Sequence, residues 1–236
     1  MKFCFDCDDT LYDLQDPFRK CIAQFFPDYE GDLEEFYRIY REYGDEVFDL
    51  LQNDTITVYD SGIYRIYASS QALGLEMSLE QAADFQDLYR ENQHHIQMAP
   101  SYHEYFKNTS SEIAILTNGF DDHQLMKLKA LDVFAYFAPD HVYTSGQLGY
   151  AKPDPQAFQA IAKYTHTNIS DWYYIGDNYI NDMKGAKGAG MHTIHLNRHH
   201  QMEGDAADYV VYTEEQLIAL LKKLENRGYV VSNEDL

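Results

Sequence analysis

Short apolar runs alternate with segments of helical character along most of the chain. Five of these runs have the length and the β-branched or aromatic content of buried strands: residues 2–6 (KFCFD), 112–119 (EIAILTNG), 141–145 (HVYTS), 171–177 (DWYYIGD) and 192–196 (HTIHL). Between them, apolar residues recur at the three-to-four-residue spacing of amphipathic helices. The alternation predicts an α/β fold, a doubly wound, Rossmann-like parallel sheet with helices on both faces.

Residues 14–98 interrupt this alternation. The segment is rich in tyrosine, has helical spacing throughout and contains no buried-strand pattern. Ser78 is a candidate N-cap within it, and Pro100 is placed to open the helix that returns the chain to the sheet. The sequence therefore predicts a core domain made of residues 1–13 and 99–236, with a helical cap domain of residues 14–98 inserted after the first strand.

The composition is strongly acidic. Against 18 lysines and arginines there are 39 aspartates and glutamates, a formal net charge of −21 in 236 residues, while 45% of the residues are hydrophobic and 15% are aromatic. Such apolar content indicates a folded protein, and the acidic excess argues against binding to nucleic acid or to anionic membranes.

The protein's location is expected to be the cytoplasm. No apolar run reaches the ~18 residues of a membrane span, and the N-terminus lacks the apolar region of a signal peptide. The three cysteines (Cys4, Cys7 and Cys21) form no zinc-site pattern and suit a reducing environment.

An acidic cluster follows the first predicted strand. Asp6 and Asp8 open the segment DCDDTL, and spaced aspartates also begin calcium-binding loops. Counted from Asp6, however, a calcium loop needs glycine at its sixth position and glutamate at its twelfth, where this sequence has Leu11 and Pro17. The calcium interpretation therefore fails.

Further polar residues fall near the ends of other predicted strands. They are Thr117 and Asn118 in TNG, Lys152 in AKPDP, and Asp177 and Asp182 in GDNYIND. Each alone has a structural explanation, as a turn, a surface lysine or acids at a helix start. Because ligands bind at the carboxyl ends of parallel strands, the same residues together could bind Mg²⁺ and anionic oxygens.

These four motifs, in this order, resemble those of the haloacid dehalogenase-like hydrolase superfamily. The helical insert between the first two motifs resembles the type I cap of that superfamily. Among the members of the superfamily, the chain looks most similar to bacterial pyrimidine 5'-nucleotidases. This similarity is in three segments of the predicted core: ILTNGFDDHQLMKLKALDVF, AKPDPQAF and LNRHH.

The resemblance implies a role for each motif residue. Asp6 would be the nucleophile that forms an aspartyl-phosphate, and Asp8 the general acid and then the general base. Thr117, Asn118 and Lys152 would bind the phosphoryl oxygens.

The resemblance also implies a metal site. Mg²⁺ would be bound by Asp6, the carbonyl of Asp8 and Asp177, with Asp182 supporting it directly or through water.

The implied function is a Mg²⁺-dependent phosphomonoesterase that acts on a small phosphorylated metabolite, best matched by a nucleoside 5'-monophosphate. Asp8 argues against dehalogenation, because halide release needs no leaving-group acid and dehalogenases of the superfamily lack this aspartate. Three alternatives stay open: a phosphosugar or phosphoglycolate phosphatase, a phosphomutase of the same fold, and a binding module without turnover. The sequence does not specify the oligomeric state, and it assigns no role to the tyrosines of the insert or to the histidine pairs at 94–95 and 199–200.

Overall fold

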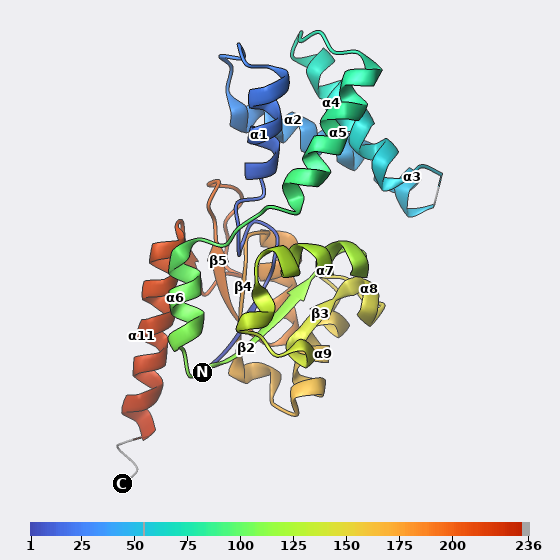
Figure 1. Ribbon diagram of the computed structural model, residues 1–236. Coiled ribbons are helices and arrows are strands. Elements are labelled where there is room, and N and C mark those ends of the chain that lie inside the picture. Colours follow the sequence, from blue (N-terminus) through green and yellow to red (C-terminus); the bar gives the residue numbers. More distant parts are fainter. Residues whose placement is uncertain (54, 233–236) are drawn as a thin grey trace. The chain divides into compact units, whose positions relative to one another are not determined.

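The computed structural model describes residues 1–53 and 55–232 and divides the chain into two units (Figure 1). One unit combines Met1–Asp13 with the chain from Gln97 onward, and the other is Leu14–Ile96. Residue 54 of the predicted insert and residues 233–236 of the predicted core lie outside the described residues. Residues 97 and 98, placed in the insert by the sequence analysis, belong to the first unit.

A six-stranded, all-parallel sheet organises the first unit, in the order β3-β2-β1-β4-β5-β6. The strands are β1 (Lys2–Phe5), β2 (Glu112–Thr117), β3 (Val142–Thr144), β4 (Trp172–Gly176), β5 (His192–Leu196) and β6 (Tyr209–Val211). The predicted α/β fold and its five strands are confirmed. The edge strand β6 was not among the predicted strands.

Both faces of the sheet are covered. Phe5 of β1 packs edge-on against Phe106 of α6 (Pro100–Asn108), and α11 (Glu214–Ser232) lies beside α6 (Figure 1). Cys4 points to the opposite face, into a cluster that contains Phe158 of α9 (Pro155–Thr165) and Ala186 of α10 (Gly185–Ala189). The strands are therefore buried on both sides, which explains why their sequences read as continuous apolar runs.

Short elements complete this unit. They are α7 (Asp121–Ala130), η1 (Val133–Ala135), η2 (Pro139–His141), α8 (Ser145–Leu148), η3 (Ile169–Asp171) and a π-helical turn, η4 (Tyr179–Lys184). Pro100 is at the start of α6, as predicted. The strand β1 lies between β2 and β4, and the chain runs outward from β1 in both directions, so the carboxyl ends of these strands form the topological switch point where such sheets bind ligands.

The second unit is helical over its described residues. Its helices are α1 (Asp16–Phe25), α2 (Leu33–Glu46), α3 (Phe48–Gln52), α4 (Val58–Ala72) and α5 (Leu79–Gln93). Aromatic rings fill its core, with Phe18 at the centre of contacts to Phe36, Tyr40 and Phe85. Ser78 caps α5 as predicted, in a capping box with Gln81.

Among the described residues, no helix is both long and apolar enough to cross a bilayer.

Candidate active site

Three of the predicted residues meet through one lysine. The ammonium of Lys152 lies 2.8 Å from Oδ1 of Asp6 and 2.7 Å from Oδ1 of Asp182, although the three residues come from separate segments that are far apart along the chain. Asp6 directly follows β1, and its backbone N–H donates to the carbonyl of Ile175 in β4 (2.8 Å). The position of Asp6 is thus fixed by the central strand pair.

Lys152 is almost completely buried, with 3% of its side chain exposed. Its Nζ also donates to the hydroxyl of Tyr174 (2.9 Å), which donates in turn to the carbonyl of Leu116. Burial alone would lower the pKa of Lys152, but the charges of Asp182 and Asp6 outweigh it and raise that pKa. The lysine therefore stays charged and holds the two carboxylates together.

The carboxylates outnumber this lysine. One oxygen from each of Asp6, Asp177 and Asp182 lies within 4.8 Å of the others. Burial raises the pKa of Asp6 to about 7, the charges of Asp182 and Asp8 add to the rise, and Lys152 opposes it. Burial and the neighbouring carboxylates also raise the pKa of Asp177. A second cation would relieve this repulsion, and three carboxylates are ligands that suit Mg²⁺.

The loop after β4 is shaped to bring Asp182 into the site. Oδ2 of Asp182 accepts a hydrogen bond from the backbone N–H of Asn178 (3.0 Å), and the Asn178 side chain caps η4 by accepting from the N–H groups of Ile180 and Asn181. A β-carbon on Gly176 would lie 2.4 Å from Oδ2 of Asp182. Only glycine leaves room there for the buried carboxylate.

His195 of β5 fixes the same loop from the other side. Its Nε2 lies 2.7 Å from the carbonyl oxygen of Asp177, and since a carbonyl only accepts, Nε2 carries the proton. Burial lowers the pKa of His195. His195 was not predicted as a site residue, because nothing in the segment HTIHL distinguishes it from a core position.

Thr117 and Asn118 both make contacts inside the protein. The hydroxyl of Thr117 donates to Oε1 of Gln124 (3.2 Å). The amide of Asn118 forms two bonds with the backbone of Lys152, donating to its carbonyl (2.9 Å) and accepting from its N–H (2.8 Å). Asn118 therefore positions the lysine-bearing loop beside the end of β2.

Asp8 lies in a separate cluster formed with α7. Lys127 Nζ is 2.6 and 2.5 Å from the two carboxylate oxygens, the hydroxyl of Tyr12 donates at 2.6 Å, and Nε2 of Gln124 is at 3.3 Å. Burial would raise the pKa of Asp8, but the Lys127 charge and these hydrogen bonds lower it to about 2. Lys127 and Gln124 were not among the residues predicted from the sequence; their spacing of three on a helix after TNG was the available signal.

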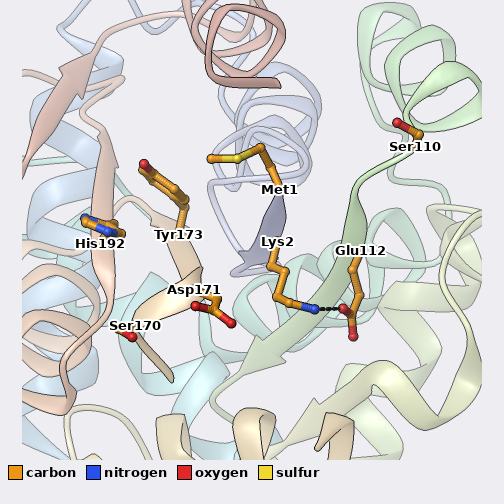
Figure 2. A pocket seen from close by; sticks show the side chains of 8 residues that line it. All are labelled: Met1, Lys2, Ser110, Glu112, Ser170, Asp171, Tyr173 and His192. Atoms are coloured by element: carbon orange, nitrogen blue, oxygen red, sulfur yellow. Dashed lines mark hydrogen bonds and ion pairs between the residues drawn. The ribbon is translucent and has the colours of Figure 1, made fainter. Parts of the chain in front are cut away.

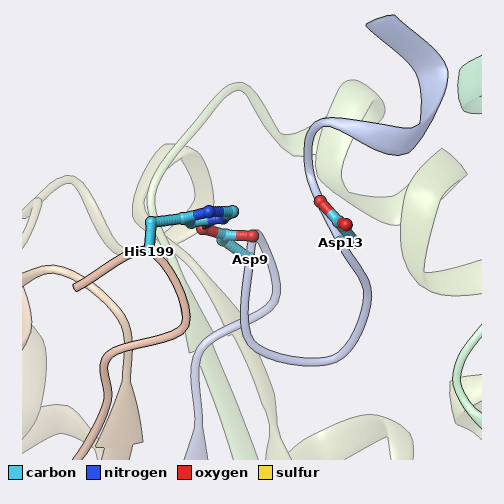
Figure 3. A group of neighbouring side chains, drawn as sticks. All are labelled: Asp9, Asp13 and His199. Carbon is cyan, nitrogen blue, oxygen red and sulfur yellow. Dashed lines mark ion pairs between the residues drawn. The ribbon is translucent and has the colours of Figure 1, made fainter. Parts of the chain in front are cut away.

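The remaining acids of the first loop have partners of their own. The carboxylate of Asp9 lies 2.9 Å from Nε2 of His199, and Asp13 is their neighbour in a group whose ligand atoms all fall within 4.8 Å (Figure 3). Asp9 also lies 3.8 Å from Nε of Arg198, whose Nη1 pairs with Glu214 (2.6 Å). This group ties the first loop to the segment that follows β5.

A pocket of about 540 Å³ lies at the amino ends of the strands. Its walls come from the first residues of the strands, including Lys2, Glu112, Tyr173 and His192, and Lys2 is paired with Glu112 (Figure 2). Asp6 and Asp177 follow the opposite ends of these parallel strands. The pocket is therefore separate from the carboxylate site.

The sequence of this chain matches a known protein family. A family model described as haloacid dehalogenase-like hydrolase matches residues 3–190, most of the chain. The match contains all seven site residues predicted from the sequence.

Individual relatives share parts of the chain. The pyrimidine 5'-nucleotidase YjjG of Escherichia coli is 33% identical over 117 residues, which are 48% of this chain and 51% of that protein. The glyceraldehyde 3-phosphate phosphatase of Methanocaldococcus jannaschii is 29% identical over 117 residues, 48% of this chain and 50% of that protein. The chain thus spans about half the length of these curated relatives.

A solved structure extends the likeness to nearly the whole fold. The crystal structure of the HAD-hydrolase YfnB from Bacillus subtilis, with magnesium bound, superposes with a TM-score of 0.68 at 21% sequence identity. The match covers 93% of this chain and 97% of YfnB.

Proposed function

Because this chain belongs to the haloacid dehalogenase-like hydrolases, we propose that it is a Mg²⁺-dependent phosphomonoesterase acting on a small phosphorylated metabolite, most specifically a nucleoside 5'-monophosphate. The observation that supports this most directly is the placement of Lys152 between Asp6 and Asp182, at 2.8 and 2.7 Å. A buried ammonium beside a carboxylate suits a site that must bring a nucleophile and an anionic phosphoryl group together.

In the proposed reaction an oxygen of Asp6 attacks phosphorus, and the bond from phosphorus to the ester oxygen breaks. Asp8, in its protonated form, gives a proton to the departing alcohol; the negative charge of a bound phosphate ester would raise the pKa of Asp8 from the low value that Lys127 sets in its absence. Asp8 then takes a proton from water, whose oxygen attacks phosphorus and releases Asp6 together with inorganic phosphate. One residue separates the two aspartates after the strand, so both carboxylates could reach the same phosphoryl group.

Phosphate binding is assigned to the residues around Lys152. Its ammonium and the hydroxyl of Thr117 would bind phosphoryl oxygens, and Asn118 would contribute by holding the Lys152 backbone. The buried partners of Lys152 hold its ammonium in place beside Asp6, so the side chain does not have to be ordered when a substrate binds.

The carboxylates around Asp6 fit a magnesium ion. Asp6, Asp177 and Asp182 supply three oxygen ligands within 4.8 Å, and the carbonyl of Asp8 would supply a fourth. When bound, Mg²⁺ would offset the negative charges of the nucleophile and of the phosphate. This assignment also accounts for three acidic groups facing a single lysine.

The substrate class rests on the similarity to the pyrimidine nucleotidase, which is 33% identical. A sugar or triose phosphate is the second candidate, because the glyceraldehyde 3-phosphate phosphatase is similar over an equally long segment. A comparative assay of nucleoside monophosphates, glyceraldehyde 3-phosphate, phosphoglycolate and hexose phosphates, read as released phosphate, separates them.

The activity itself is tested with an aryl phosphate and added Mg²⁺. We expect turnover that falls by at least about 1,000-fold in Asp6→Asn, which keeps the shape of the side chain but removes the nucleophile. Metal chelation should abolish the wild-type activity and Mg²⁺ should restore it. Turnover that persists in Asp6→Asn, or the absence of turnover with every phosphate ester, would overturn the proposal.

A further inference from the structure

The side chain of Lys127 is buried to an extent that requires a partner. Only 3% of it is exposed, and it extends from the second turn of α7. A lysine is rarely buried this completely unless a charged group compensates the loss of water. Its ammonium pairs with the carboxylate of Asp8, which it reaches with both distances at or below 2.6 Å.

Asp8 is held from several directions. Tyr12 donates to Oδ1, the oxygen that also lies 2.6 Å from Lys127, and Gln124 approaches Oδ2. The side chain of Asp8 nevertheless keeps 26% of its surface exposed. The carboxylate is therefore fixed on its protein side and still open to a reacting molecule.

The helix that supplies these contacts is itself anchored to the phosphate-binding motif. Gln124 and Lys127 are three residues apart, so they share one face of α7. Nε2 of Gln124 donates to the carbonyl of Asn118 (2.8 Å), and its Oε1 accepts from Thr117. These bonds fix the position of α7, and with it that of Lys127, relative to the end of β2.

Stability alone is a weak reason for such a pair. Burying an ammonium and a carboxylate costs solvation free energy that their attraction often fails to return, so apolar replacements are frequently as stable. A buried lysine aimed at a carboxylate that remains open to solvent is better explained by a need to orient that carboxylate.

We propose that Lys127 is a positioning residue for Asp8: its ammonium, assisted by Tyr12 and Gln124, fixes the carboxylate in the orientation required for proton transfer to and from the reacting oxygens. This inference rests on the proposed phosphatase function. It assigns Lys127 no contact with the substrate.

The leaving group provides a selective test. An aryl phosphate releases a stable phenolate and needs little help from an acid, whereas a nucleoside 5'-monophosphate releases a basic alkoxide and depends on proton transfer. In Lys127→Met we expect kcat/KM for the nucleotide, or for another alkyl phosphate that the wild type turns over, to fall about 100-fold. The value for the aryl phosphate should fall less than about fivefold.

Two further variants sharpen the comparison. Lys129→Met removes the same charge from an exposed position on the same helix and should leave both substrates unaffected. In an Asp8→Asn background, Lys127→Met should cause no additional loss, because Lys127 acts through Asp8. If Lys127→Met does not fold, Tyr12→Phe removes one hydrogen bond to Asp8 and should show the same preference for the aryl substrate, by several-fold.

The possible results separate the role of Lys127 from the phosphatase proposal. Equal losses with both substrates in a folded Lys127→Met protein, or an additive loss in the Asp8→Asn background, would overturn the role of Lys127 while leaving the phosphatase proposal intact. A wild type that hydrolyses no phosphate ester would overturn both.

Discussion

Gly176 is the residue at which the packing of the site is tightest. The α-carbon lies so close to Asp182 that an added β-carbon would be 2.4 Å from Oδ2 and 2.5 Å from Cγ of the carboxylate. The carboxylate is fully buried and bonded both to Lys152 and to the N–H of Asn178, so it has no free space to move into. A single methyl group here would displace a whole side chain of the site.

Gly176→Ala is therefore expected to reduce kcat/KM by about 100-fold, since displacements on the order of 1 Å have such effects in active sites. The apparent Mg²⁺ affinity, measured by calorimetry, should weaken as well. Gly188→Ala is the matched control: a β-carbon added there, in α10, would meet no atom within 4 Å, and the change should leave activity intact and stabilise the helix by up to about 1 kcal/mol. Full activity in Gly176→Ala would show that Asp182 is not needed where it lies.

At the scale of elements, loops after the strands are held by hydrogen bonds that cross between elements. Asp208, just before β6, is an example: its Oδ2 accepts from the backbone N–H of Thr193 in β5 (3.0 Å), and its Oδ1 pairs with Lys187 of α10. Thr193 returns the contact by accepting from the N–H of Asp208 (2.9 Å). This reciprocal arrangement attaches the short edge strand, whose three residues would otherwise form few contacts.

The attachment should depend on pH. Partial burial would raise the pKa of Asp208, but the hydrogen bonds from Lys187 and Thr193 outweigh it and lower the pKa below its ordinary value. The ionised form thus stabilises the folded state above the unfolded pKa of about 4, and this contribution is lost as the pH falls through the lower, folded pKa. In Asp208→Asn we expect a loss of about 1 kcal/mol in the free energy of unfolding at pH 7 that shrinks towards pH 3.

Urea unfolding at several pH values measures this difference. Asp140→Asn, at an exposed acid in η2, is the control and should change stability little at any pH. A deficit in Asp208→Asn that stays constant from pH 7 to pH 3 would contradict the electrostatic explanation.

At the scale of the whole molecule, the net charge of −21 would oppose the approach of the proposed phosphate-ester substrate, which is an anion. Lys152 supplies positive charge inside the site, but it is buried and therefore does little to attract an anion that is still far away. The acidic surface dominates at long range and repels the anion. Counterions shorten the range of that repulsion from about 30 Å at 0.01 M salt to about 8 Å at 0.15 M.

We therefore expect kcat/KM for a phosphate ester to rise roughly threefold when KCl is increased from 0.01 to 0.15 M at saturating Mg²⁺. Most enzymes that bind anions through exposed basic surfaces show the opposite trend. A monotonic fall with salt would indicate an exposed basic approach to the site that the acidic composition does not suggest.

The sequence by itself determined the sheet and the order of its chemical motifs. The strands β1, β2, β4 and β5 are buried on both faces, so they appear as apolar runs, and each polar residue at or directly after their carboxyl ends is conspicuous. Asp6, Thr117 and Asp177 could be identified in this way, and the end of a parallel strand indicates which edge of the sheet they share. The helix starts at Ser78 and Pro100 were predictable because capping is a local interaction.

Only the tertiary structure decided which of these residues touch and what surrounds them. The bonds from Lys152 to Asp6 and Asp182, and from Asn118 to the Lys152 backbone, join positions far apart in the chain, and residue spacing contains no information on such contacts. The same holds for Lys127, which reads as one more surface lysine of a helix until the fold buries it against Asp8. Burial and pairing depend on the packing of several elements at once, whereas strand pattern and capping depend on neighbours in sequence.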